Sequence, residues 1–453
     1  HTPNPPGIDD VNSSSNAGLR IEQATPGLTR SLNLAAFHSD LDYGLTVPVL
    51  GPPYSAAVGS HESYQGASLT FREERTLSAA SDLAYQTSFE RTTLKIRPFE
   101  EVRNKLAAEA QHRVRWLPTH ELVWGGAASY SGDRITSAYP LDFSNAETGS
   151  TVLSVFAQDE WRLAQWPLTW SYGLRIDRST LNDRASVQPN LRALWTLRPG
   201  QVVWASIARA ERLPTRAESS ANFTAGVLPP GGGSPLPVEY KFVAGAAGDA
   251  RNEGLDLFEL GYRGEWFSEL FVDATAYAGR YRDLRSYRLQ TPYLALDPLR
   301  YVQPATIDWH GKASVTGAEL ALDWKLMRDL RTRWSATHIE LRADDQTLLP
   351  SERAVIEGGT PRDQAGAQLV WQVAPAHELD ATVLHVGALP AYAIGAYTRF
   401  DARWAWRVTR DVELALVGQN IGSGAHAEFR QSDLASPLTQ IRSNWYAKLT
   451  MKF

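Results

Sequence analysis

Side chains alternate between apolar and polar residues along most of this chain, and no other feature restricts its fold as strongly. The last nine residues, WYAKLTMKF (445–453), place Trp, Ala, Leu, Met and Phe on one side of an extended strand and Tyr, Lys, Thr and Lys on the other. The segments LTWSYGLRI (168–176), TGAELALDWKL (316–326) and FDARWAWRV (400–408) repeat this pattern. Because successive strand side chains point to opposite faces of a sheet, the alternation predicts strands with one apolar and one polar face.

The connections between these strands also alternate in length. Short turns such as TPG (25–27), RPG (198–200) and MRD (327–329) are separated by long Gly/Pro-rich loops near 45–63, 132–150, 211–252, 281–312, 343–362 and 421–441. Outer-membrane barrels have short turns at one end and long loops at the other. We predict an all-β fold, a transmembrane antiparallel up-and-down β-barrel. Its nineteen strands are expected at about 18–25, 29–44, 64–77, 82–96, 104–116, 119–131, 151–163, 166–178, 188–198, 201–210, 253–265, 268–280, 313–327, 329–342, 363–374, 376–387, 397–408, 411–420 and 442–453.

A soluble β protein is the alternative to a membrane barrel. A soluble sheet of this size needs a second layer over its apolar face, and the sequence has few helical segments to supply one. No repeat of roughly 20–50 residues indicates a solenoid. The 15 Trp and 17 Tyr suit a surface that meets both lipid and water. Lys and Arg total 45 against 50 Asp and Glu, which does not favour nucleic-acid binding.

The apolar positions predict which residues face lipid. Asp159 breaks the alternation, because it shares a parity with Val155 and Trp161. We have only one account of it, a position close to the periplasmic rim. The residues expected to face lipid are Leu168, Trp170, Leu174, Leu322, Trp324, Leu369, Trp371, Trp404, Leu449 and Phe453.

The strand number bears on the ends of the barrel. Single-chain bacterial barrels have an even number of strands, whereas nineteen is odd. We therefore expect an N-terminally truncated barrel, with residues 1–17 in an external loop. An open or strained seam is expected between the first strand and the last, since both run in the same direction.

Several strings along the chain resemble TonB-dependent outer-membrane receptors. SVFAQDEWRL (154–163) with WSYGLRID (170–177) is similar to a strand pair of that family, and VVWASIARAERLPTRAE (202–218) is similar to a later strand and loop entry. The closing WYAKLTMKF resembles its terminal strand, and the resemblance implies that the barrel-insertion machinery recognises Phe453. It also implies a bacterial outer-membrane location, a barrel of about 22 strands, and a globular plug through which the TonB system acts. Neither the plug nor about three of those strands is expected in this chain.

Residues at the long loops are the candidates for ligand binding. Aromatic rings and arginines at a pore mouth suit an organic ligand that carries carboxylate groups or a chelated metal. The alternative is that Arg and Glu rows line a wet wall and pair with each other. The candidate residues are Arg209, Arg212, Arg216, Tyr281, Tyr287, Tyr293 and Trp309.

The function expected from these features is uptake of a scarce nutrient, such as a ferric siderophore or another metal complex. The alternative is a passive pore or a surface-binding barrel without energy coupling. We expect no enzyme activity, no cofactor and no metal site, because the ten His residues show no ligand spacing. Asp308 with His310 is the best pair for a barrel enzyme, and a solvated loop histidine explains it better.

Overall fold

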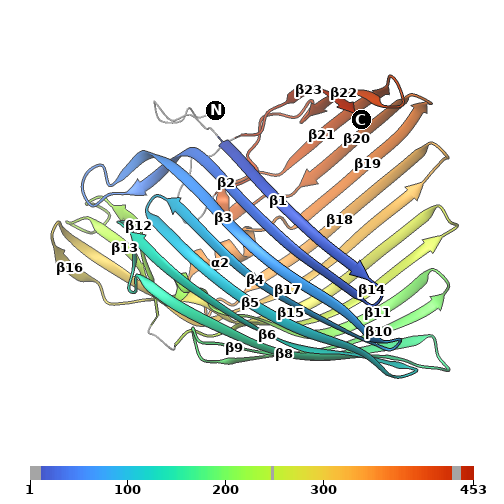
Figure 1. Cartoon of the computed structure of the whole chain (residues 1–453). Helices are drawn as coiled ribbons and strands as arrows, with labels where there is room; N and C mark the ends of the chain where they lie inside the picture. Colours follow the sequence, from blue (N-terminus) through green and yellow to red (C-terminus); the bar gives the residue numbers. More distant parts are fainter. Residues whose placement is uncertain (1–11, 246–248, 431–439, 453) are drawn as a thin grey trace.

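The computed structural model describes residues 12–245, 249–430 and 440–452, and its strands join in one strongly curved sheet (Figure 1). Nineteen strands pair in chain order to form the wall, and each pairing between them is antiparallel. The predicted number and direction of the wall strands are confirmed for the described residues. The wall strands are β1 (Asn12–Thr25), β2 (Leu28–Pro48), β3 (Ser55–Ser78), β4 (Ser81–Ile96), β5 (Phe99–Leu117), β6 (His120–Ser137), β8 (Glu147–Arg162), β9 (Leu168–Ser179), β10 (Ala185–Arg198), β11 (Gln201–Arg212), β14 (Glu253–Trp266), β15 (Leu270–Leu289), β17 (Leu299–Lys325), β18 (Leu330–Ala343), β19 (Asp363–Ala374), β20 (His377–Val386), β21 (Tyr397–Arg407), β22 (Val412–Gln419) and β23 (Asn444–Met451).

Several strands extend beyond their predicted ends. β2 and β3 pair from Leu28 with Arg75 to Pro48 with Ser55, so most of the expected loop at 45–63 is strand. Residues 12–17, which we expected in an external loop, form the start of β1. Residues 1–11 lie outside the described part of the chain. The prediction failed at these ends because hydrogen bonds to a neighbouring strand hold segments whose own alternation is weak.

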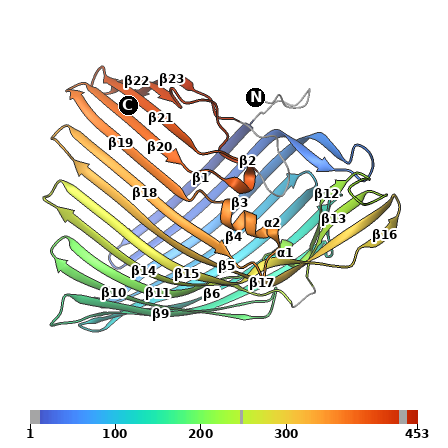
Figure 2. The same cartoon turned by 180° about the vertical axis from the view of Figure 1, so that it is seen from behind.

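The remaining elements lie in the long connections. β7 and β12 pair with each other, and β13 pairs in parallel with β17. Figure 1 shows β12, β13 and β16 gathered at one end of the sheet, which we call the long-loop end, and Figure 2 shows α2 at the same end. These elements are β7 (Leu141–Phe143), β12 (Ala221–Leu228), β13 (Val238–Val243), β16 (Tyr293–Leu296), α1 (Arg216–Ser220), α2 (Pro350–Gly358) and the 3-10 helix η1 (Pro390–Tyr392).

Among the described residues, no helix combines the length and the apolar character needed to cross a membrane.

The pairing register divides the side chains between two faces of the wall. Directly paired residues share a face; Leu168 lies opposite Trp195, and Leu322 lies between Val272 and Trp334. Followed from strand to strand, the register places nine of the ten residues predicted to face lipid on one face, which we call the outer face. Phe453 lies outside the described residues. The nine are Leu168, Trp170, Leu174, Leu322, Trp324, Leu369, Trp371, Trp404 and Leu449.

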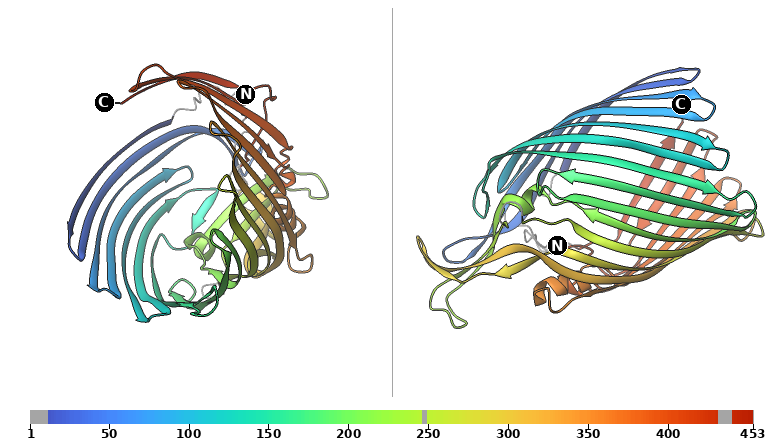
Figure 3. Two further views of the ribbon diagram at one scale, coloured as in Figure 1. Left: turned by 90° about the vertical axis from the view of Figure 1, so that its right-hand side faces the viewer. Right: turned by 90° about the horizontal axis from the view of Figure 1, so that it is seen from below.

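The opposite, inner face carries charged side chains and meets the loops. Asp133 on this face of β6 pairs with Arg216 of α1 at 3.1 Å. The left view of Figure 3 shows the segment that follows β11, in green, inside the curve of the wall. Arg403 on the inner face of β21 reaches three carboxylates, those of Glu378, Asp380 and Glu413, at 2.6–2.7 Å. Charged side chains on the inner face therefore pair with one another, both between strands and with the loop segment that follows β11.

Asp159, the exception to the alternation, lies on the outer face near the short-turn end. It is only 5% exposed and accepts hydrogen bonds from His120 Nδ1 at 2.6 Å, from the Tyr172 hydroxyl at 2.6 Å and from Trp116 Nε1 at 3.3 Å. Three donors on neighbouring strands compensate the buried carboxylate, which on its own would be costly on an apolar face. A polar residue at this position is thus consistent with the strand register.

The wall has two edges in the described part of the chain. β1 pairs there with β2 alone, and β23 with β22 alone. Figure 3 shows these strands, in blue and red, at the two borders of the curved sheet. Both run in the same direction, because the nineteen wall strands alternate. In the described part of the chain β1 and β23 are not paired with each other, so the open seam expected between the first and last strands is present.

Candidate functional site at the long-loop end

The segment that follows β11 is held in place by a short helix with a defined start. In the string TRAE, the Thr215 side chain accepts a hydrogen bond from the Glu218 backbone N–H at 3.3 Å, and the Glu218 carboxylate accepts one from the Thr215 backbone N–H at 2.8 Å. This reciprocal arrangement is a capping box, which a Thr followed three residues later by Glu predicts. It begins α1 directly after β11 enters the longest loop.

Glu218 connects this helix to β11 and to the long-loop end of β15. Its carboxylate accepts hydrogen bonds from both terminal nitrogens of Arg212, at 2.8 and 3.0 Å, and Arg212 Nε also binds Glu253 at 2.7 Å. Arg285 approaches Glu218 at 3.8 Å, and its guanidinium lies 5.7 Å from the ring centre of Tyr287. We call Arg212, Glu218, Glu253, Arg285 and Tyr287 the mouth cluster. It contains two arginines, two carboxylates and an aromatic ring.

The protonation of the cluster follows from its contacts. Burial by itself would raise the pKa of Glu218, but hydrogen bonds from Arg212 and from the Thr215 backbone outweigh burial and lower the pKa. Hydrogen bonds to Glu253 and Glu218 raise the pKa of Arg212. Both groups are therefore charged at neutral pH. The two arginine side chains are similarly exposed, 43% for Arg212 and 45% for Arg285, but Arg212 donates hydrogen bonds to two carboxylates whereas Arg285 only approaches Glu218 at 3.8 Å.

Glu218→Gln is expected to loosen the loop around α1 at neutral pH. The amide cannot accept both charged donors of Arg212, so about 1–3 kcal/mol of local stability is lost. Because the folded-state pKa of Glu218 is lowered, its contribution exists above the pKa of the unfolded chain and disappears as pH falls through the folded value. Amide hydrogen exchange of residues 212–220 should therefore be faster in the variant at neutral pH and similar to the parent in acid.

Glu340→Gln is the matched control for this prediction, because Glu340 pairs with the exposed Arg342 at 2.9 Å. It should leave exchange at residues 212–220 unchanged. Equal protection in parent and Glu218→Gln at neutral pH would show that Glu218 does not hold the loop.

The other predicted ligand residues are dispersed. Arg216 is largely buried and bonded to Asp133, to the Asn145 carbonyl and to Ser220. Trp309 is only 2% exposed. Both side chains are therefore packed inside the long-loop end and are largely shielded from solvent.

Three further candidates point in different directions. Arg209 lies on the outer face, paired with Asp256 at 2.7 Å. Tyr281 lies on the inner face, between Leu255 and Ala313. Tyr293 belongs to the β16 hairpin and is exposed. Of the seven candidates, the structure brings only Arg212 and Tyr287 into one cluster.

Four residues of this region were not among the sequence candidates: Glu218, Glu253, Arg285 and Phe242. Arg285 stands two residues before Tyr287, and Phe242 packs on Tyr287 with ring centres 4.3 Å apart. The string RDLRSYRL (282–289), with three Arg and one Tyr, was a signal for Arg285. Nothing near Phe242 in the sequence indicates that β13 meets the end of β15.

A second cavity of about 290 Å³ lies nearby and includes Arg184, Arg251, Arg288, Asp308 and His310 among its lining residues. Asp308 binds Arg288 at 2.5 Å and also contacts His310 Nδ1. Burial would raise the pKa of Asp308, but the Trp309 backbone N–H, His310 and Arg288 lower it.

The Asp308 pair resembles a hydrolase site only in part. Ser286, opposite Asp308 in the register, is buried, and its hydroxyl accepts the His310 backbone N–H at 3.3 Å. An enzyme would need an accessible nucleophile bonded to the imidazole itself. Among the described residues, no three His, Asp or Glu side chains are grouped to hold a metal ion.

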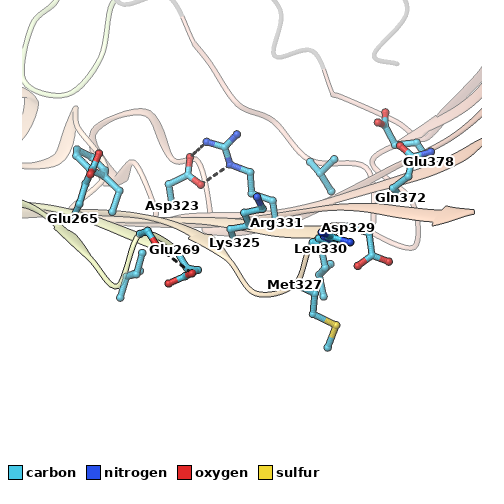
Figure 4. Close-up of a pocket in the computed structure, with 15 residues that line it drawn as sticks. Glu265, Glu269, Asp323, Lys325, Met327, Asp329, Leu330, Arg331, Gln372 and Glu378 are labelled. Atoms are coloured by element: carbon cyan, nitrogen blue, oxygen red, sulfur yellow. Dashed lines mark hydrogen bonds and ion pairs between the residues drawn. The ribbon is translucent and has the colours of Figure 1, made fainter. Parts of the chain in front are cut away.

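A further cavity, about 630 Å³, lies at the other end of the wall, on the inner face beside the short turns (Figure 4). Asp323 and Arg331 form a hydrogen-bonded pair there at 2.6 Å, and Glu265, Glu269 and Glu378 add acidic groups. Of the described residues that line it, Phe271 alone is aromatic. The cavity suits a polar partner rather than an aromatic ligand.

Comparison with known proteins agrees with this architecture. Residues 3–421 match the family described as "TonB dependent receptor-like, beta-barrel". The chain belongs to this family. No curated protein matches it closely enough to count as a relative.

Solved structures of receptors and transporters share the fold. The siderophore receptor PirA from Acinetobacter baumannii superposes with a TM-score of 0.73 at 12% identity, over 98% of this chain and 71% of PirA. The copper transporter OprC gives 0.71 at 16% identity, over 98% and 74% of the two chains. The ferric-catecholate import receptor Fiu from E. coli K12 gives 0.71 at 11% identity, over 98% and 75%. At these identities the likeness shows the fold alone.

Proposed function

We propose that this barrel belongs to a bacterial outer-membrane receptor that imports a scarce nutrient, with a ferric siderophore or another metal complex as the substrate. Membership of the TonB-dependent receptor family supports uptake as the activity. The similar structures include receptors and transporters named for siderophores, copper and ferric catecholates. Because these similar structures are named for different substrates, the fold does not identify the substrate of this chain, which has to be inferred from its own residues.

In this proposal the outer face contacts the lipid of the outer membrane. Large apolar side chains such as Trp324, Trp371 and Leu449 are exposed on that face. Lipid removes them from water, and the strand pairing satisfies the backbone within the hydrocarbon. Phe453 is the residue we propose for recognition by the insertion machinery. The TonB system would act through a plug, as the family implies.

The mouth cluster is the observation that carries the ligand proposal. Arg285 is exposed and lies over the ring of Tyr287, and it approaches Glu218 only at 3.8 Å, so its guanidinium has donors to offer a ligand at the long-loop end. A metal complex with carboxylate or catecholate groups can accept those donors. Arg212 and Glu218 position the loop and contact the ligand indirectly.

The test is a binding titration followed by quenching of the intrinsic fluorescence of the 15 Trp residues. Ferric catecholate, ferric hydroxamate and copper complexes are added separately to the purified chain in detergent. Arg285→Ala should weaken binding of the preferred complex about tenfold or more, since it removes a charge-assisted contact. Arg342→Ala, which removes an arginine that pairs only with Glu340 among the described residues, is the matched control and should bind like the parent.

Two results would contradict this proposal. Equal affinity of the parent and Arg285→Ala for every complex would remove the mouth cluster from the ligand site. Solute flux through vesicles containing the chain, with no saturable binding of any complex, would favour a passive pore.

A further inference from the structure

The outer face carries an aromatic belt near the short turns. His120 lies between two indoles, with ring centres 5.1 Å from Trp116 and 5.5 Å from Trp161. His377 stacks on Trp404 and Trp406 at 5.7 and 6.1 Å. Rings that are apolar on one side and polar on the other collect where hydrocarbon meets headgroups. This belt marks the level of lipid headgroups at the short-turn end.

Two arginines are held side by side at the same end of the outer face. Arg30 lies directly opposite Glu73 in the register, and Arg75 is two residues further along β3. Arg30 Nε binds one carboxylate oxygen of Glu73 at 2.7 Å, and Arg75 Nη2 binds the other at 2.9 Å. Glu73 is 2% exposed, whereas the arginine side chains are 41% and 50% exposed. We call these three residues the arginine bridge.

The arginine bridge has donors and charge left over. One carboxylate compensates two guanidinium groups, so a net charge of about +1 remains on a face otherwise rich in apolar side chains. Each guanidinium has five N–H donors, and Glu73 occupies only part of them. Such a charge is costly beside hydrocarbon unless an anion completes it. A phosphodiester fits, because guanidinium groups bind its oxygens in pairs.

An apolar strip continues from the arginine bridge toward the middle of the wall. Leu34, Leu69, Phe89 and Leu106 lie in one register row on the outer face, and all are exposed. The row is four residues from Arg30, roughly 13 Å along the strand. Free phosphate would use the arginines alone, whereas a phospholipid would use the arginines and the strip together.

We propose that the arginine bridge binds the phosphate of a phospholipid in the leaflet at the short-turn end, with the acyl chains along the apolar strip. The proposal rests on the proposed membrane location of the barrel. It does not depend on which nutrient the mouth cluster binds. The bound lipid holds β2 and β3 beside β1, the first strand of the wall.

The test is native mass spectrometry of the purified chain in a non-ionic detergent. Dioleoyl phosphatidylglycerol is titrated against dioleoylglycerol, which has the same acyl chains and no phosphate. The parent should bind the phospholipid at least about tenfold more tightly. Arg30→Gln/Arg75→Gln should reduce that preference to about twofold or less, and inorganic phosphate at tenfold excess should not displace the lipid.

The matched control is Arg72→Gln/Arg113→Gln, which removes two arginines from the inner face at the same end. Arg72 pairs there with Glu74 and Arg113 with Asp82. The control should keep the preference for phospholipid, and equal loss in both double variants would overturn the proposal. Equal binding of both lipids by the parent would also overturn it, and this measurement does not depend on whether a variant folds. Displacement by inorganic phosphate would exclude phospholipid as the occupant. The assay contains no metal complex, so its failure leaves the nutrient-uptake proposal standing.

Discussion

Leu322→Arg is expected to reduce the stability of the inserted barrel by about 1–3 kcal/mol, between the cost of an arginine at the bilayer midplane and its cost near the interface. Leu322 lies on the outer face between Val272 and Trp334, three residues from the end of β17 at Lys325. An arginine at this position places a charge against hydrocarbon with no carboxylate opposite it in the register. Urea unfolding in phospholipid vesicles, followed by tryptophan fluorescence, measures the loss.

Ala321→Arg is the matched control for Leu322→Arg, one residue away on the inner face. Ala321 lies opposite Asp273 and Ser335, so the new arginine has a carboxylate and a hydroxyl beside it. We expect a loss of less than about 1 kcal/mol at this site. If Leu322→Arg inserts and unfolds like the parent, or if Ala321→Arg is the more damaging change, the assignment of the two faces is wrong.

Arg403→Ala is expected to cost roughly 2–3 kcal/mol at neutral pH, below the range for a fully buried pair because these groups are partly exposed. Without the guanidinium, Glu378 and Asp380 of β20 and Glu413 of β22 repel one another across β21. Salt screens this repulsion, so the loss should be smaller at high ionic strength than at low ionic strength. Thermal unfolding at the two salt concentrations measures both effects.

The control for Arg403→Ala is Arg342→Ala, which separates one exposed pair with Glu340 and should cost less than about 1 kcal/mol. A loss at Arg403 that is the same at low and high salt would mean that packing of the aliphatic stem, rather than charge repulsion, dominates.

Strand pairing and face assignment were the most predictable features of this chain. The alternation around Leu322 and Trp404 is local, and a period of two admits only an extended strand with those residues on one face. The turns TPG (25–27) and RPG (198–200) were also predicted from their residue types. In the structure Gly27 and Gly200 adopt positive φ, 76° and 80°, which glycine permits at no steric cost. For these strands and turns, the local sequence pattern predicts the same backbone conformation that the strand hydrogen bonds require.

The candidate site was predicted only in part. The sequence placed Arg212 and Tyr287 in two separate loops, and it contained no signal that Arg285, beside Tyr287, reaches Glu218. Arg216 and Trp309 looked equally suitable from residue type, yet Arg216 is held by Asp133 of β6 and by the Asn145 carbonyl, and Trp309 is only 2% exposed. Burial of such a side chain depends on which distant segments fold over it, and the local apolar–polar pattern does not predict those segments.

The sequence by itself determined the strands, their number in the wall and the face that each large apolar side chain occupies, because those properties depend on neighbours one or two residues away. Only the tertiary structure decided where polar groups are satisfied. Asp159 is tolerated on the apolar face because His120, 39 residues earlier, donates to it, and the arginine bridge exists because β2 and β3 bring Arg30 to Glu73 across 43 residues. Hydrogen bonds and ion pairs need donor and acceptor within about 3 Å, and only the folded register brings such distant residues that close.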